Sequence, residues 1–145
     1  MFKINIITAF PEVFPGCLDV SILAKARKKK IWDLDTVDLK KFSSQTKSMD
    51  DKPFGGGPGM VIRADVLQNA YEKAKIFFED YNFENVEKIM LTPDGEEFNH
   101  STAEALTKKK GLLIICGRYE GVDERFIEYN NLRKISIGKY ILCGG

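Results

Sequence analysis

The sequence lacks several features that would assign it to common functional classes. It has three cysteines without a CxxC pair and a single histidine, so it encodes neither a disulfide framework nor a zinc site. No run approaches the roughly 18 apolar residues that a membrane-spanning helix needs, and the first residues do not resemble a signal peptide. We therefore expect a soluble, cytoplasmic protein with no membrane partner and no metal site of this kind.

Two common nucleotide-binding motifs are also absent. A P-loop needs a Gly-Lys-Ser/Thr sequence after its first glycine, and residues 55–63 (GGGPGMVIR) do not contain one. A Rossmann fingerprint would place glycines directly after the first strand, where this chain has Thr8-Ala9-Phe10-Pro11. That sequence also argues against Rossmann-type methyltransferases. The single histidine, His100, directly precedes a predicted helix start and is expected at the surface, which disfavours a hydrolase.

Charge is balanced over the whole chain but uneven along it. The 145 residues are 43% hydrophobic and 30% charged, which fits one globular domain, and the net charge is +1. Lysines nevertheless gather at residues 25–30 (KARKKK) and 108–110 (KKK). These runs are compatible with solvated helix ends and also with contacts to phosphate groups, and the sequence leaves both interpretations open.

The alternation of strand and helix patterns predicts an α/β fold. We expect a mostly parallel sheet with helices on both faces. The expected strands are 3–8, 32–39, 86–91, 111–116 and 134–137, and the expected helices are 19–30, 63–78, 101–110 and 123–129. A capping box from Ser101 to Glu104 is predicted to start the third helix. Residues 40–60 show no periodicity, which indicates a long functional or mobile segment.

Glycine and proline follow three of the expected strand ends. TPDG follows Leu91 as a predicted turn, CGRYEG begins at Cys116, and GKYILCGG follows Ile137. Because ligands bind beyond the carboxyl ends of strands in open α/β sheets, these loops are candidate binding segments. Any one of them alone is compatible with an ordinary turn, but the occurrence of three favours a shared site.

Five segments together resemble one family, the bacterial tRNA (guanine-N1)-methyltransferases. They are FPEVF at residues 10–14, DDKPFGGGPGM at 50–60, LTPDG at 91–95, CGRYEGVDERFI at 116–127 and SIGKYILCGG at 136–145. The resemblance extends along the whole chain. It implies a SPOUT methyltransferase domain with a deep trefoil knot, which is a rare exception to unthreaded folds. It also implies transfer of a methyl group from S-adenosylmethionine to N1 of the guanine on the 3′ side of the tRNA anticodon.

The same resemblance implies the residues of the site. The cofactor would be held by Leu91, Thr92, Pro93, Gly117, Tyr119, Glu120, Gly121, Ser136, Ile137, Gly138, Lys139, Tyr140, Ile141, Leu142, Gly144 and Gly145. Glu120 would lie by the methionine end of the cofactor, where its carboxylate could attract the ammonium or hold Mg²⁺. The alternative for Glu120 is a surface salt bridge with Arg118 or Arg125.

The resemblance assigns the tRNA substrate to Asp50, Gly57, Pro58, Gly59 and Arg118. The glycines and Pro58 would leave space for a flat guanine, although a structural hinge is the alternative. Three residues depart from the family pattern: Lys139 replaces an aspartate, Cys143 a serine and Phe54 a tyrosine. These departures weaken the implied side-chain contacts at those positions and leave the main-chain contacts unaffected.

The resemblance also implies parts beyond this chain. The family's general base is an aspartate that would lie beyond Gly145, before a helical C-terminal tRNA-binding domain, and the family forms homodimers with shared active sites. We therefore expect residues 1–145 to be an N-terminal cofactor-binding domain that lacks its last helix, is inactive alone, and exposes Phe126, Ile127 or Ile135. A non-catalytic RNA-binding protein of the same fold is the alternative function.

Overall fold

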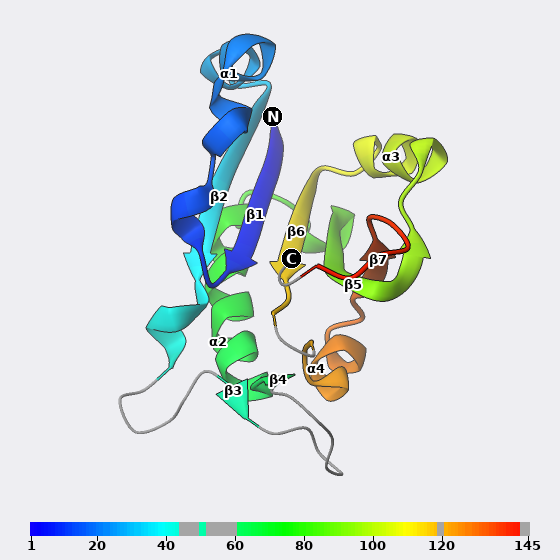
Figure 1. The fold of residues 1–145 in the computed structure, drawn as a ribbon. Helices are drawn as coiled ribbons and strands as arrows, with labels where there is room; N and C mark the ends of the chain where they lie inside the picture. The colour runs from blue at the N-terminus through cyan, green and yellow to red at the C-terminus, as the bar shows by residue number, and fades with distance from the viewer. Residues whose placement is uncertain (44–49, 52–60, 119–120, 143–145) are drawn as a thin grey trace.

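The computed structural model describes residues 1–43, 50–51, 61–118 and 121–142 (Figure 1). In these ranges one five-stranded sheet has the order β2-β1-β6-β5-β7, and every neighbouring pair is parallel. Its strands are β1 Phe2–Thr8, β2 Trp32–Asp38, β5 Val86–Glu97, β6 Gly111–Cys116 and β7 Arg133–Ser136. Two short strands, β3 Asp50–Asp51 and β4 Val61–Ile62, form a separate antiparallel ribbon. The predicted α/β class and parallel sheet are confirmed.

Helices cover both faces of the sheet, as predicted. They are α1 Ser21–Lys28, α2 Ala64–Lys75, α3 His100–Thr107 and α4 Glu124–Tyr129. Single 3₁₀ turns occupy Pro11–Val13, Gly16–Asp19, Leu39–Phe42, Ile76–Phe78 and Phe83–Asn85. Successive side chains of a strand point to opposite faces, so Ile6 packs with Ala26 of α1 while Ile7 joins the core under α2. In the same way Ile89 packs with Leu106 of α3 on the face opposite Met90.

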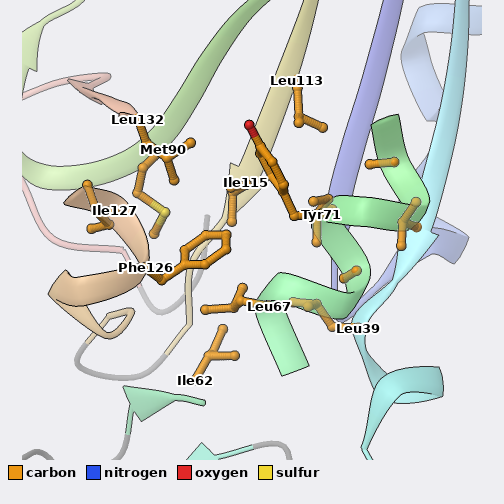
Figure 2. Packing of buried hydrophobic residues seen from close by; sticks show 14 of the residues in the cluster. Leu39, Ile62, Leu67, Tyr71, Met90, Leu113, Ile115, Phe126, Ile127 and Leu132 are labelled. Carbon is orange, nitrogen blue, oxygen red and sulfur yellow. The ribbon is translucent and has the colours of Figure 1, made fainter. Parts of the chain in front are cut away.

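The apolar stripe of α2 fixes the position of α4. Val66, Leu67, Ala70, Tyr71 and Ala74 are all buried, as the 3.6-residue period predicts. The Tyr71 ring meets the Phe126 ring of α4 edge-on, with centroids 5.9 Å apart (Figure 2). Figure 2 shows Ile115 of β6 and Met90 of β5 in the same cluster. This packing holds α4 against the carboxyl ends of β5 and β6.

Three sequence-based expectations about this region are wrong. β5 does not end in a turn at Leu91 but continues to Glu97. The side chain that caps α3 is Asn99, whose Oδ1 accepts a hydrogen bond from the backbone N–H of Thr102, so the helix does not begin with the Ser101 capping box. Phe126, Ile127 and Ile135 are only 3%, 7% and 2% exposed, because α2 and α4 cover one face of the sheet there and α3 the other.

Candidate functional site

A cavity of about 450 Å³ lies at the carboxyl ends of β5, β6 and β7. Its wall is formed by residues 90–94 of β5, by Gly117 and Arg118 after β6, by the start of α4, and by residues 134–138 and 140–142. This volume falls within the range of small-molecule sites. The place agrees with the expectation that ligands bind beyond the carboxyl ends of parallel strands.

Most of the predicted cofactor residues meet in this cavity. Those that line it are Leu91, Thr92, Pro93, Gly117, Gly121, Ser136, Ile137, Gly138, Tyr140, Ile141 and Leu142, and Arg118, predicted for the substrate, joins them. Lys139 does not belong to this lining: it is 92% exposed, and its ammonium lies 3.9 Å from the Glu97 carboxylate. The departure from aspartate at this position therefore falls outside the cavity wall.

Several predicted residues lie outside the part that the structure describes. They are Tyr119, Glu120, Gly144 and Gly145 for the cofactor, Gly57, Pro58 and Gly59 for the substrate, and the family departures Phe54 and Cys143. For Asp50 the structure gives the backbone, as part of β3. The roles of Asp50 and of the residues outside the described ranges remain predictions.

A bulge in β5 shapes one wall of the cavity. Leu91 and Glu96 both pair with Ile135 of β7, so the four residues between them, TPDG, are displaced from the ladder. A Cβ atom on Gly95 would lie 2.6 Å from the backbone nitrogen of Ile135, closer than real Cβ atoms come. Glycine is needed here because β7 passes directly over this position. The bulge leaves Thr92, Pro93 and Asp94 on the cavity wall.

A turn held by Ser136 forms another part of the wall. The buried Ser136 hydroxyl donates to the carbonyl oxygen of Gly138 at 2.8 Å and accepts from the Gly138 N–H at 3.3 Å. The chain that follows this turn lines the cavity as far as Leu142. The apolar side chains that follow, Ile137, Tyr140, Ile141 and Leu142, line the cavity and are each more than half exposed.

Three charged residues on the cavity wall form an ionic group that the sequence did not reveal. The Lys134 ammonium lies 2.7 Å from a Glu124 carboxylate oxygen and 3.2 Å from an Asp94 carboxylate oxygen. The Thr92 hydroxyl also donates to Asp94. That hydrogen bond, followed by the one from Lys134, lowers the pKa of Asp94, while the hydrogen bonds to Glu124 and Asp94 raise the pKa of Lys134. One cation between two carboxylates leaves this group with one net negative charge.

The ribbon of β3 and β4 is attached to the cavity wall. The buried Ile62 N–H donates to the carbonyl oxygen of Gly121 at 3.1 Å, and Ile62 forms a parallel bridge with Val122. Both Gly121 and Val122 line the cavity. The glycine-rich segment 52–60 therefore leaves from and returns to a ribbon that touches the predicted site.

At the start of α4, the Arg125 side chain is paired with Asp123. The Asp123 carboxylate accepts from the Arg125 backbone N–H at 3.0 Å and from its guanidinium at 2.6 Å. The hydrogen bond from Arg125 is the main cause of the lowered pKa of Asp123. Arg125 thus binds Asp123, and the proposed pairing with Glu120 concerns a residue outside the described ranges.

The described part of the chain contains neither a cluster of metal-binding side chains nor a membrane-spanning helix. Among residues 1–43, 61–118 and 121–142, no group of three His, Cys, Asp or Glu side chains is placed to hold a metal ion. His100 is 91% exposed, as expected for a surface residue. In the part of the chain that is described, none of the helices combines the length and apolar character needed to cross a membrane.

Comparison with known proteins identifies the family of this chain. Residues 2–145 match the family described as tRNA (Guanine-1)-methyltransferase TrmD. Proteins named tRNA (guanine-N(1)-)-methyltransferase are 43% identical in Wolbachia pipientis subsp. Culex pipiens, 42% in Bartonella bacilliformis and 38% in Ehrlichia canis. Each match covers 99% of this chain but only 60%, 59% and 59% of the respective relative. The chain therefore belongs to the tRNA (guanine-1)-methyltransferase TrmD family.

Proposed function

We propose that this domain binds S-adenosylmethionine in the cavity at the ends of β5, β6 and β7. In the whole protein, this site would serve the methylation of N1 of the guanine on the 3′ side of the tRNA anticodon. The observation that carries the proposal is the convergence of three separate predicted loops on one cavity. Membership of the TrmD family supports the reaction class.

The lining of the cavity fits the proposed cofactor. Main-chain groups of the segment after β7 would read the polar edge of adenine, and Ile137, Ile141 and Leu142 would supply apolar contacts. The net negative charge of the Asp94–Lys134–Glu124 group suits a cationic ligand. When bound, S-adenosylmethionine supplies an electrophilic methyl group on its sulfonium.

The residues of this chain would act mainly by positioning. Ordering the two reactants in line can remove about 7–11 kcal/mol of an activation barrier. The Ser136 turn and the β5 bulge are built by hydrogen bonds within the chain, so the walls keep their shape before the ligand binds. Guanine N1 carries a proton that a carboxylate must accept. We assign this task to an aspartate beyond Gly145, with Glu120 as a second contributor.

The substrate guanine would lie between the cavity and the glycine-rich segment. The attachment of Ile62 to Gly121 supports this placement, because it ties the ends of that segment to the cavity wall. Gly57, Pro58 and Gly59 would make room for the base, and Asp50 and Arg118 would contact its polar groups. Replacement of Gly59 by valine should then abolish methylation and leave the circular dichroism spectrum unchanged; full turnover by this variant would restore the hinge interpretation.

The remaining predictions concern partners. We propose that the protein binds tRNA and a second copy of the chain, and that it acts in the cytoplasm. We also propose that the Glu120 carboxylate binds Mg²⁺. Four apolar side chains of the cavity lining are exposed: Ile137, Tyr140, Ile141 and Leu142. Their exposure supports the proposal that another part of the whole protein covers them. Residues 1–145 would then form the cofactor-binding domain of a longer enzyme and be inactive alone.

Calorimetry and a methylation assay test this proposal. The full-length protein should bind S-adenosylmethionine and its demethylated product, and it should methylate a tRNA transcript with guanine after the anticodon but not one with adenine there. Binding of tRNA without any affinity for either cofactor form would overturn the enzyme and support the non-catalytic RNA-binding protein.

A further inference from the structure

The two lysine runs meet at the amino end of the sheet. Residues 25–30 contain the end of α1 and precede β2, and residues 108–110 connect α3 to β6. β1 lies between β2 and β6, and its Phe2 N–H donates to the Ile31 carbonyl while its Lys3 N–H donates to the Lys110 carbonyl. Because neighbouring strands lie about 4.8 Å apart, the backbone at residue 31 and the backbone at residue 110 are roughly 10 Å apart. Figure 1 shows the amino terminus between α1 and α3.

Both runs follow helices that cover the same face of the sheet. Ile6 of β1 packs with Ala26 of α1, and Ile89 of β5 packs with Leu106 of α3. The next residue of each strand points to the opposite face and belongs to the core cluster under α2 and α4. The carboxyl ends of α1 and α3 therefore bring the two runs to one edge of one face.

Most lysines of the two runs have no carboxylate within ion-pair distance in the described part of the chain. These lysines are all exposed: Lys25, Lys28, Lys29, Lys30, Lys108 and Lys110. Arg27 takes the two nearby carboxylates instead, since its guanidinium lies 3.2 Å from Asp33 and 4.0 Å from Asp19. These three residues line a hollow of about 560 Å³ together with Met1, Lys28 and Lys30. The two lysines therefore give this hollow its uncompensated positive charge.

Helix dipoles account for only part of this arrangement. A dipole favours cations within the last turn of a helix, which applies to Lys25 and Lys28 of α1. Lys30 lies two residues beyond α1 and Lys110 lies three beyond α3, so their charges gain little from either dipole. The two runs hold eight of the 22 Lys and Arg residues, so the other 14 stand against all 21 Asp and Glu residues. Positive charge is thus concentrated in one place, as in proteins that bind a nucleic-acid backbone.

We infer that Lys28, Lys30, Lys108 and Lys110 form a surface, the amino-end lysine surface, that binds the sugar–phosphate backbone of a helical stem in the RNA substrate. The inference rests on the proposed function, since it takes the target guanine to lie at the cavity. β1 has seven residues, so the two ends of the sheet are about 20 Å apart, a distance that a duplex spans in roughly six base pairs. A stem of that length beside the anticodon loop reaches the amino end, where its phosphates add affinity without sequence readout.

Lys73 is a matched control for these lysines. It is exposed on α2, which covers the other face of the sheet, and no carboxylate of the described residues lies within ion-pair distance of its ammonium. Lys73→Gln removes the same charge as Lys30→Gln or Lys110→Gln, so it separates position from net charge. Lys30→Arg keeps a cation that can contact phosphate and serves as the rescue variant.

The test measures binding of a tRNA transcript to the full-length protein by fluorescence anisotropy, without cofactor, at salt concentrations between about 50 and 200 mM. Lys30→Gln and Lys110→Gln should each weaken binding several-fold and reduce the log–log salt slope by about 0.7–0.9, and the double variant should lose about twice as much slope. Lys73→Gln and Lys30→Arg should match the unmodified protein. A single-stranded oligonucleotide with the anticodon-loop sequence, which has no stem, should bind equally to all variants.

Salt slopes for Lys30→Gln and Lys110→Gln that equal the slope for Lys73→Gln would overturn the inference, as would an equal loss of affinity for the single-stranded oligonucleotide. Binding to phosphatidylserine vesicles that the double variant loses, with tRNA binding unchanged, would assign the lysines to a membrane surface instead. Calorimetry with S-adenosylmethionine keeps the two proposals apart, because all variants should bind the cofactor as the unmodified protein does. A protein that binds no cofactor would refute the proposed function, while the salt slopes would still decide whether the amino-end lysine surface binds RNA.

Discussion

The two ends of the same sheet are built differently. At the amino end, the Phe2 N–H donates to Ile31 and the Lys3 N–H to Lys110, so β1 is tied to the segments that precede β2 and β6. At the carboxyl end, β5 is interrupted by a bulge and β7 runs into the Ser136 turn. The first end extends the backbone hydrogen bonds of the sheet into the preceding segments, whereas the second carries loops and the cavity.

The lysine runs belong to the amino end. Figure 1 shows α1 and α3 at one end of the sheet and α4 with the β3–β4 ribbon at the other. Lys25 and Lys28 occupy the last turn of α1, where cations suit the helix dipole, and residues 108–110 follow α3. The most basic segments are therefore far from the cavity. The length of a lysine run in the sequence therefore does not indicate whether its charges lie near the cavity.

The largest effect is expected from replacing Gly95 by valine. Its Cβ would meet the backbone of Ile135, so β5 and β7 must separate and the cavity wall must move. We expect a loss of about 3 kcal/mol or more in the free energy of unfolding, and loss of S-adenosylmethionine binding. Chemical denaturation and calorimetry measure both.

Gly16→Ala is the control for Gly95. A Cβ at Gly16 meets no atom within 4 Å, and only its φ of +52° is unfavourable, so the variant should lose roughly 1–2 kcal/mol and still bind cofactor. If Gly95→Val were as stable as the unmodified protein, the close approach of β7 would be wrong.

Lys3→Met should affect stability at the amino end without affecting the site. The buried Lys3 ammonium donates to the Phe77 carbonyl at 2.9 Å and lies 4.7 Å from the centre of the Tyr81 ring. Its loss should reduce the free energy of unfolding by about 1–3 kcal/mol. The exposed Lys73→Met serves as the control. A change in cofactor affinity greater than the calorimetric error would contradict the separation of the two ends.

Ser136→Ala should act on the site more than on stability. The loss of two hydrogen bonds to Gly138 should cost about 1 kcal/mol in the free energy of unfolding. Because the residues that follow this turn line the cavity, we expect cofactor affinity to fall several-fold in calorimetry. Thr107→Ala, which removes an exposed hydroxyl bond to Glu104 in α3, should leave that affinity unchanged.

Lys134→Met should give a small, pH-dependent loss of stability. The lowered pKa of Asp94 contributes stability above the ordinary aspartate pKa, about 3.9, and this contribution disappears as pH falls through the lowered value. The raised pKa of Lys134 contributes stability that disappears as pH rises above about 10.4. The variant should therefore be less stable between these limits, by at most about 1 kcal/mol because the carboxylates are exposed. A difference that is constant from pH 3 to 7 would contradict the ion-pair origin.

The last prediction changes no residue and compares the rates at which Cys17 and Cys116 are chemically labelled. Burial raises the pKa of the Cys116 thiol to about 11, while Cys17 is exposed. Iodoacetamide at pH 8 should therefore modify Cys17 much faster, as peptide mass spectrometry would show. Equal rates would mean that the end of β6 opens readily.

The elements and the site loops could largely be predicted, whereas the contacts between them could not. The α2 stripe and the GLLIIC strand follow from hydrophobic periods that one segment carries by itself. The bulge at Thr92–Gly95 depends on the close passage of β7, and TPDG alone has the sequence of an ordinary turn. The Lys134 ion pairs and the hydrogen bond from Lys3 to Lys110 join residues 10 to 107 positions apart, which no local pattern encodes.

The most direct test of the proposed site is a map of backbone amide shifts in a nuclear magnetic resonance titration with S-adenosylmethionine. The proposal predicts the largest changes at residues 91–95, 117–118, 121–122 and 136–142, with residues 28–31 and 108–110 unchanged. Changes centred on the amino end, or no changes at millimolar cofactor, would contradict it.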